Sequence, residues 1–270
     1  MSYETQKFLR LSGLACPFND ALPPGVARDE RGIALIHART AALVDAEAGL
    51  SAEGVVMLAD QALSAAVRNA VGDAPMATVS YRCDFHDAPD GGGDLAFALR
   101  QVRHAGPFAV ADVDVLTADS EVLVASVRGR FRVGSLPGGV RATEPGAWPS
   151  LQAKAWDSLH AFLDIDPAAN RFVLHPHLRL IGAYALPAFH GGVVAAALGL
   201  SARLALKQAH PASWRLTECE ASYLRPSIAQ EGTEFGVRIA AAGRTTAVVF
   251  SDAVQEGTLR VACRSVFERL

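Results

Sequence analysis

Three consecutive residues, His190, Gly191 and Gly192, precede a long run of small apolar residues. A polar residue and two glycines before such a run predict the start of a helix. Glycine at that place lets a ligand approach the backbone closely. The first N–H groups of a helix have no partner within the helix, so they can bind an oxyanion or a polarised carbonyl oxygen. A helix cap with glycines that serve only tight packing is the alternative, and the tripeptide alone does not separate the two.

A carboxylate is the second candidate for chemistry. Asp60 lies in the segment 52–70, whose apolar residues cover most of a helix circumference and predict a buried helix. Burial of a carboxylate is costly unless the group is paired or used. Ser64 follows four residues later and therefore shares a helix face with Asp60. Two structural alternatives stay open: Asp60 bonded to a neighbouring backbone group, and Ser64 as a small core residue.

The chain repeats itself at a constant offset. Ser51 aligns with His190 at an offset of 190 − 51 = 139 residues. The same offset aligns three further pairs, which are Thr78 with Thr217, Phe85 with Leu224, and Gly93 with Gly232. Several landmarks in one ungapped register predict two copies of a single folding unit.

Each copy is predicted to contain one strand, one buried helix and four further strands. In the first copy the strands are expected at 33–44, 76–85, 95–103, 107–116 and 121–133, and the helix at 52–70. In the second copy the strands are expected at 172–180, 213–224, 234–242, 245–254 and 258–269, and the helix at 193–209. Short connections rich in Gly, Asp and Ser favour hairpins, so the sheet should be antiparallel.

These elements divide the chain into four parts. Turn-forming residues predict that 1–30 is an N-terminal extension on the surface. The two folding units are predicted at 31–133 and 171–270. Between them, residues 134–170 are predicted to form a Gly- and Pro-rich linker that contains a short amphipathic helix over 151–163.

Composition excludes several functional classes. The chain has 270 residues, of which 50% are hydrophobic, so it can bury a large core. A net charge of −3 argues against a nucleic-acid surface, and no apolar run is long enough to span a membrane. The four cysteines are far apart and lack metal-ligand spacing, which favours reduced thiols in a cytoplasmic protein.

No metal and no cofactor is expected. The acidic and histidine residues at 84–87 precede a glycine turn and favour a solvated loop. His175 and His177 flank a proline, with no acid or thiol nearby in the sequence to complete a metal site. The sequence also lacks the Gly-x-Ser-x-Gly pattern of serine hydrolases and a phosphate-binding glycine loop.

The repeated unit resembles the hotdog-fold thioesterases, and among them the phenylacetate-pathway type of acyl-CoA thioesterase. The resemblance rests on the motif at 190–192, on Leu58-Ala59-Asp60, and on the series from Thr217 to Gly232. It covers the chain except the first 30 residues and the linker. It implies an α+β fold in which an antiparallel sheet wraps round a central helix. Two such units in tandem would then pair edge to edge as an intrachain pseudo-dimer with a continuous sheet.

The resemblance also implies roles for the candidate residues. Asp60 would be the nucleophile or the general base, and the Ser64 hydroxyl would help to hold the attacking water. The N–H groups of Gly191 and Gly192 would polarise the thioester carbonyl, with Gly192 as the main contact. His190 would either bind the substrate or brace the turn. The implied substrate is an acyl-CoA, and two such chains could associate as a homodimer.

Arginines are candidates for the phosphates of coenzyme A. Arg225 stands just before a proline in the second copy, and Arg82 lies in the first. Two other functions compete with hydrolysis. A hotdog hydratase or dehydratase acting on an enoyl or hydroxyacyl thioester would use a histidine and a carboxylate as an acid–base pair. A non-catalytic acyl-CoA-binding protein would also retain the fold while losing motif residues.

The repeat predicts a single working site. The glycine pair of the second copy and Asp60 of the first copy would form one complete site. In the mirror site Glu53 stands where the other copy has Gly192, since 53 + 139 = 192. Asp60 and Ser64 are replaced there by Gly199 and Arg203, since 60 + 139 = 199 and 64 + 139 = 203. The mirror site therefore lacks both the glycine pair and the acid.

Overall fold

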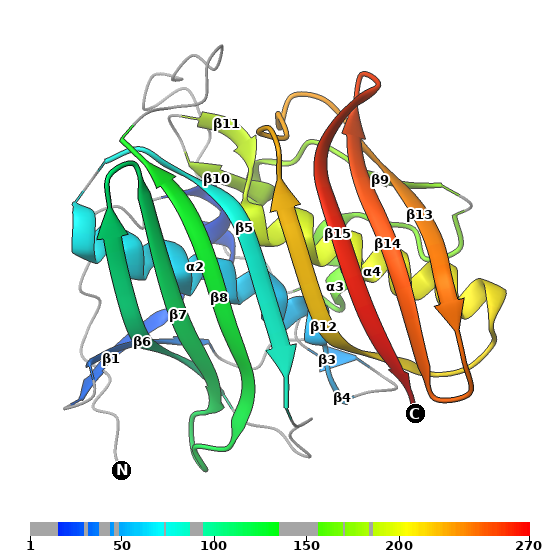
Figure 1. Ribbon diagram of the computed structural model, residues 1–270, viewed down its shortest axis with the longest axis horizontal. Helices are drawn as coiled ribbons and strands as arrows, with labels where there is room; N and C mark the ends of the chain where they lie inside the picture. Colours follow the sequence, from blue (N-terminus) through cyan, green and yellow to red (C-terminus); the bar gives the residue numbers. More distant parts are fainter. Residues whose placement is uncertain are drawn as a thin grey trace.

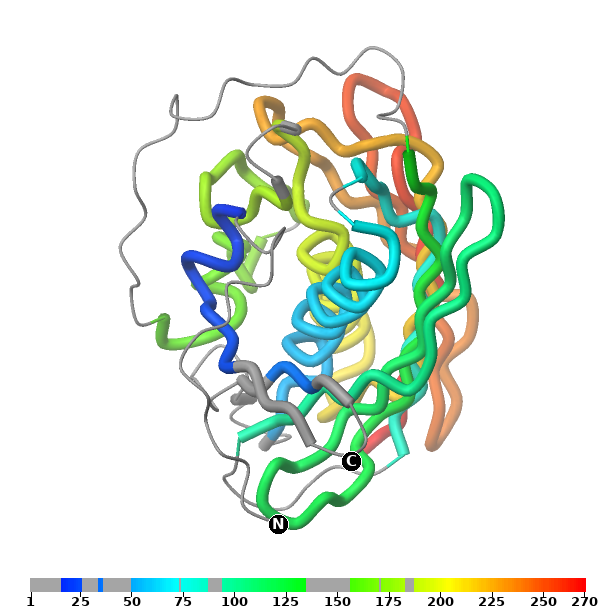
Figure 2. The backbone as a smooth tube through the Cα atoms, turned by 90° about the vertical axis from the view of Figure 1, so that its left-hand side faces the viewer, coloured from blue at the N-terminus to red at the C-terminus, as the bar shows by residue number. Residues whose placement is uncertain are grey.

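The computed structural model describes residues 16–29, 32–37, 44–45, 49–72, 74–86, 94–134, 156–169, 171–183 and 186–270. Eleven strands of this part form one antiparallel sheet, which lies on one side of two long helices (Figure 1). Figure 2 shows a third layer on the opposite side of the helices, built from the segment that begins at residue 16 and from the segment between 156 and 189. The helices are therefore enclosed between the sheet and these segments.

Apart from the edge strand β1, the two halves of the sheet have the same strand order when each is followed inward from its edge. The order runs β1-β2-β6-β7-β8-β5-β12-β15-β14-β13-β9, so that β2-β6-β7-β8-β5 mirrors β9-β13-β14-β15-β12. The first-unit strands are β1 (Gly25–Asp29), β2 (Gly32–His37), β5 (Met76–Phe85), β6 (Leu95–Ala105), β7 (Phe108–Thr117) and β8 (Leu123–Val133). The second-unit strands are β9 (Phe172–Leu174), β12 (Trp214–Tyr223), β13 (Thr233–Ala242), β14 (Thr246–Gln255) and β15 (Thr258–Arg269).

The two units join at β5 and β12. These strands pair antiparallel, with Cys83 opposite Cys219. Each would otherwise be the open edge of its unit, with unpaired backbone groups. The pairing closes both edges and makes one continuous sheet, as the repeat predicted.

Each unit supplies one of the two long helices. They are α2 (Ala52–Val71) and α4 (Gly191–Ala209). The Ser51 side chain caps α2 by accepting a hydrogen bond of 3.1 Å from the Gly54 N–H. Asp60 in the middle of α2 lies beside the start of α4, and Glu53 at the start of α2 lies beside Gly199 of α4. The helices thus run antiparallel, related by the same pseudo-twofold axis as the strands.

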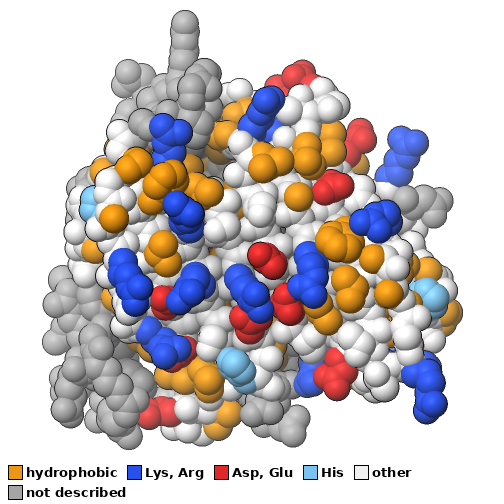
Figure 3. Space-filling model, in the orientation of Figure 1, with side chains coloured by type: hydrophobic (Ala, Val, Ile, Leu, Met, Phe, Trp, Pro, Cys, Tyr) orange, Lys and Arg blue, Asp and Glu red, His pale blue; other side chains and the backbone are white. Residues whose placement is uncertain are grey.

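The outer face of the sheet is charged and solvated. Figure 3 shows arginines and acidic residues intermixed in a band across this face. Cross-strand ion pairs account for part of the band: Arg100 with Asp114, Arg128 with Asp112, and Arg264 with Glu218. In β7 the side chains alternate between buried and partly exposed, as expected for a sheet with one face on the core.

The expectation that residues 1–30 lie on the surface is wrong for the segment that follows residue 15. Here a short helix, α1 (Pro17–Ala21), packs against residues 178–183 and against the His190 ring, and Phe18 is fully buried. The turn-forming residues of this segment misled the prediction, because Pro17 occupies the first turn of a helix, where proline is favoured. β1 then adds to the sheet edge by pairing with β2.

The segment before α4 is more folded than the sequence suggested. The strand expected over 172–180 is limited to β9, and a 3₁₀ turn, η2 (Leu178–Leu180), follows. A hairpin of β10 (Ile181–Ala183) and β11 (Leu186–Phe189) then leads directly into His190. A second small hairpin, β3 (Val44–Asp45) with β4 (Gly49–Leu50), precedes α2.

The linker helix is also shorter than expected. Of the predicted 151–163, residues 151–155 lie outside the described residues, and α3 spans Leu159–Leu163. Most of the predicted linker likewise lies outside the described part of the chain. None of the described helices is both long and apolar enough to cross a membrane.

Candidate active site

Both units hold the carboxylate of Asp60. Its Oδ2 accepts a hydrogen bond of 2.9 Å from the Gly192 N–H, at the start of α4 in the second unit. Its Oδ1 accepts one of 3.2 Å from the hydroxyl of Thr78, on β5 of the first unit. The pairing of β5 with β8 shifts register after Thr78, and such bulges redirect side chains near functional sites. Asp60 is only 1% exposed, so these contacts fix its orientation.

His190 caps α4 as a neutral imidazole. Its Nδ1 accepts a hydrogen bond of 3.2 Å from the Gly192 N–H and lies 3.6 Å from Asp60 Oδ2. Burial lowers the pKa of His190, and the nearby Asp60 charge only opposes this effect. An accepting Nδ1 places the ring proton on Nε2. The Phe18 ring stacks on the imidazole at 4.3 Å, so the histidine is held on two sides.

Gly191 presents the start of α4 to the site. Within the described residues its N–H has no hydrogen-bond acceptor, whereas its carbonyl accepts a bond of 2.7 Å from the Tyr223 hydroxyl. A Cβ at Gly191 would lie 2.8 Å from Asp60 Oδ2 and 2.9 Å from Thr78 Oγ1. A side chain at this position would therefore displace the carboxylate.

Gly192 lets the two helices approach each other. A Cβ there would collide with the main-chain carbonyl of Met57, which cannot move aside as a flexible side chain could. The sequence analysis expected the Gly192 N–H to be the main contact of a substrate carbonyl. In the structure this N–H donates to Asp60 and His190, so the N–H of Gly191 is the one that remains available.

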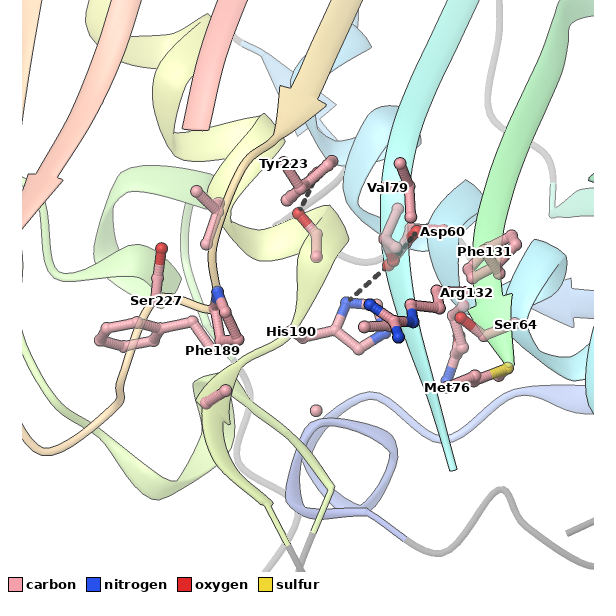
Figure 4. A pocket seen from close by; sticks show the side chains of 18 of the residues that line it. Asp60, Ser64, Met76, Val79, Phe131, Arg132, Phe189, His190, Tyr223 and Ser227 are labelled. Carbon is pink, nitrogen blue, oxygen red and sulfur yellow. Dashed lines mark hydrogen bonds and ion pairs between the residues drawn. The ribbon is translucent and has the colours of Figure 1, made fainter. Parts of the chain in front are cut away.

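A pocket of about 420 Å³ opens on both sides of Asp60. In Figure 4 the labelled first-unit residues lie on one side, and the labelled second-unit residues lie on the other. The first-unit wall includes Ser64, Arg68, Met76, Phe108, Phe131 and Arg132. The second-unit wall includes Ala188, Phe189, Tyr223, Leu224, Arg225 and Ser227.

The structure brings most of the sequence candidates together. The pocket wall includes Asp60, Ser64, His190, Gly191 and Arg225. Gly192 donates its N–H to Asp60. Arg82 is the exception. Its side chain is 51% exposed on the outer face of the sheet, where it pairs with Asp84 at 2.9 Å, and it does not contribute to the pocket.

Three residues of the site escaped the sequence analysis. Thr78 holds Asp60, Tyr223 holds Gly191, and Phe18 covers His190. Thr78 appeared only in the repeat alignment with Thr217, and Tyr223 only in the series that carries the family resemblance; neither signal gave a role. The Phe18 contact joins segments that share no recognisable pattern.

The mirror position holds an ion pair. Arg203 Nε lies 2.8 Å from Glu53 Oε1, and the Glu53 side chain is 2% exposed. Glu53 occupies the position equivalent to Gly192, and Arg203 the position equivalent to Ser64. A carboxylate side chain therefore stands at the helix start where the other site has a glycine without a side chain.

Comparison with known proteins identifies the fold. No family model and no curated protein matches the sequence. Among solved structures, the TesB protein of Mycobacterium avium subspecies paratuberculosis has a TM-score of 0.61 and 12% identity, over 96% of this chain and 98% of that one. The acyl-CoA thioesterase II of Mycobacterium marinum has a TM-score of 0.54 and 14% identity, over 88% and 91%.

A third solved structure is described by its fold alone. The Alicyclobacillus acidocaldarius protein of unknown function with a hotdog fold has a TM-score of 0.61 and 11% identity, over 94% of this chain and 97% of that one. At such identities the likeness concerns the backbone arrangement. The chain has the hotdog fold in a two-unit form, and this confirms the predicted fold class.

Proposed function

We propose that this protein hydrolyses acyl thioesters at one composite site between its two hotdog units. The contact of Asp60 with the start of α4 carries the proposal, because it joins a fixed carboxylate to a helix end whose Gly191 N–H has no acceptor among the described residues. Two of the similar solved structures are named as TesB and as an acyl-CoA thioesterase, which supports the same chemistry.

Gly191 polarises the substrate. Its N–H stands at the first turn of α4, faces the pocket and has no acceptor within the described chain. A preorganised backbone donor of this kind stabilises a developing oxyanion by about 3 kcal/mol. The Tyr223 hydroxyl donates to the carbonyl of the same residue at 2.7 Å and so fixes the adjoining peptide group. His190 braces the turn, because its Nδ1 is committed to the Gly192 N–H.

Asp60 directs the attack. As a general base it takes a proton from water, the water oxygen bonds to the acyl carbon, and the carbon–sulfur bond breaks to release the thiol and a carboxylic acid. As a nucleophile its carboxylate bonds to the acyl carbon and expels the thiolate, which gives a mixed anhydride, and water then cleaves this anhydride to release the carboxylic acid and regenerate Asp60. Ser64, one turn further on the same helix face, is placed to hold the water. Single turnovers in H₂¹⁸O identify the anhydride route: attack of water on the Asp60 carboxyl carbon of the anhydride puts the label in Asp60, whereas the general-base route puts it only in the released acid.

The proposed carrier of the acyl group is coenzyme A. The second-unit wall ends in exposed residues that include Arg225, which has no acidic partner among the described residues. A guanidinium at this end suits the phosphates of the carrier. The thioester carbonyl then lies between Asp60 and Gly191, and the acyl group extends to the first-unit side.

Thiol release from a panel of acyl-CoA substrates tests this function. Asp60→Asn is expected to lower kcat by about 10²–10⁴-fold, the range for loss of a general base. Asp112→Asn is the matched control, since Asp112 pairs with Arg128 on the outer face of the sheet and should leave kcat unchanged. Equal turnover by Asp60→Asn and wild type would contradict the proposal.

The same panel distinguishes the competing functions. Hydration or dehydration gives a change in enoyl absorbance without thiol release, and a non-catalytic binding protein gives binding without either signal. The neutral, bracing state of His190 argues against an acid–base pair with Asp60.

A further inference from the structure

The pocket has an unusual wall on the first-unit side. Every side chain that α2 contributes to it is polar: Asp60, Gln61, Ser64 and Arg68. Asp60, Ser64 and Arg68 are spaced four residues apart, so they form one stripe along the helix. The stripe covers about 12 Å of helix axis between the first and the last of them. The sheet supplies the opposite, apolar wall with Met76, Phe108 and Phe131.

Arg68 brings a positive charge into the far end of this pocket. It is partly buried in the last turn of α2. Within the described chain it has no ion pair, and Asp60 is the only acidic residue of the pocket wall. Ser64 and Asp60 line the same pocket from the same helix face, so the guanidinium shares one cavity with them. A partly buried cation without a carboxylate partner favours an anionic ligand.

Two neighbours strengthen this polarity. Arg132 is part of the pocket wall, and its backbone pairs with Ala77 and Phe108, so a second positive charge lies at the same end. Gln61 is 1% exposed, and its Oε1 has no hydrogen-bond partner within the described chain. A saturated acyl chain would desolvate the guanidinium groups without compensation, at the expense of binding, and it would offer no donor to the Gln61 oxygen.

We propose that the acyl group of the substrate carries a terminal carboxylate that binds Arg68, so that the substrate is the thioester of a short dicarboxylic acid. The inference rests on the proposed thioesterase function. The reacting carbonyl lies at Asp60 and Gly191, the carrier leaves toward Arg225, and the acyl group follows the polar stripe of α2. Asp60 and Arg68 both line the pocket, and their side chains take up part of the about 12 Å between them along the helix axis, so an acyl group of about five carbons spans the remainder.

Glutaryl-CoA and pentanoyl-CoA form a matched pair for the test, because both have five-carbon acyl groups and differ in the terminal carboxylate. The wild-type protein is expected to favour glutaryl-CoA in kcat/KM by about tenfold or more, the contribution of one charge-assisted hydrogen bond. A wild-type preference for pentanoyl-CoA would overturn the inference, whether or not any variant folds. Absence of thiol release from every acyl-CoA would instead refute the proposed function.

Substitution of Arg68 tests whether this residue causes the preference for glutaryl-CoA over pentanoyl-CoA. Arg68→Met should lower the ratio of the two kcat/KM values by about tenfold, and Arg68→Lys should lower it less. Arg100→Met is the control, because Arg100 pairs with Asp114 on the outer face of the sheet and should keep the wild-type ratio. An equal loss on both substrates in Arg68→Met would overturn the assignment.

A phosphate of the carrier is the other possible source of an anion at Arg68. The same acyl groups on N-acetylcysteamine, which has no phosphate, separate the two sources. If Arg68 binds the substrate carboxylate, the wild-type protein should still prefer the glutaryl thioester over the pentanoyl thioester on this carrier. Arg68→Met should again lose that preference. If the effect of Arg68→Met occurs only with CoA thioesters, Arg68 binds phosphate and the inference is wrong.

Discussion

Glu53 and Arg203 form an ion pair of 2.8 Å between α2 and α4, at the place that the pseudo-twofold axis relates to the contact of Asp60 with Gly192. In the repeat, Glu53 is equivalent to Gly192, whose N–H donates to Asp60, and Arg203 is equivalent to Ser64. One end of the antiparallel helix pair thus has an open pocket with a carboxylate, and the other end has a closed contact between the units.

We expect this ion pair to contribute stability and not turnover. Glu53→Ala removes a buried carboxylate from beside the Arg203 guanidinium and should lower the free energy of unfolding by about 3 kcal/mol. The kcat of the folded protein should stay near the wild-type value, because the pair is remote from the Asp60 site. Urea unfolding and thiol release measure the two quantities. Loss of turnover in a variant that remains folded would show that the mirror position is catalytic.

The two glycines of α4 should respond differently to alanine. Gly192→Ala forces a methyl group against the Met57 carbonyl and should destabilise the contact between the helices. Gly191→Ala meets the Asp60 carboxylate and the Thr78 hydroxyl, so it should lower kcat by about tenfold or more with less effect on the fold. Thermal unfolding and kcat measure both effects.

Gly236→Ala is the control for both glycine variants, since a Cβ there has no neighbour within 4 Å. It should change neither kcat nor the unfolding temperature by much. Full activity in Gly191→Ala would contradict the prediction, because it would show that turnover does not depend on the observed position of the Asp60 carboxylate.

Tyr223→Phe should weaken the support of Gly191. It removes the hydroxyl that donates to the Gly191 carbonyl at 2.7 Å and should lower the free energy of unfolding by about 1 kcal/mol. Because the affected peptide adjoins the proposed oxyanion donor, kcat should fall as well. Tyr81→Phe is the matched control, since its hydroxyl donates to the Val56 carbonyl at 3.2 Å outside the pocket. It should show a similar stability loss without the kcat loss, and equal kcat values for the two variants would contradict the prediction.

His190 should make stability depend on pH. Its pKa in the folded protein is lowered from the ordinary 6.5, first because the ring is desolvated. As the pH falls below about 6.5, His190 becomes protonated in the unfolded chain but stays neutral in the folded protein. The free energy of unfolding therefore decreases. The contribution is therefore fully present above that pH and is lost on acidification.

His190→Asn isolates this effect, because asparagine can cap α4 but does not titrate. Between about pH 8 and pH 5 the wild type should lose more stability than the variant in urea unfolding. Parallel pH profiles would show that the folded protein accepts the proton on His190 as readily as the unfolded chain does.

Much of the fold could be predicted from the sequence, because the information is local. Alternating apolar residues determine β5 and β15, whose observed bounds, Met76–Phe85 and Thr258–Arg269, match the expected ranges. The offset of 139 residues determines that there are two like units. Asp60 was recognisable because a carboxylate is out of place in a buried helix. These features depend on residues a few positions apart and on the comparison of the chain with itself.

How the candidate residues meet depends on contacts between segments that are far apart in the sequence. Asp60 and Gly192 are 132 residues apart, and their hydrogen bond depends on the axial position of α2 against α4. That position is set by close packing of the Gly192 backbone on Met57, a contact that neither helix specifies alone. The same packing decided that the N–H of Gly192 serves Asp60 and that the N–H of Gly191 stays open. The burial of Phe18 on His190 also depends on a surface that exists only after both units have folded.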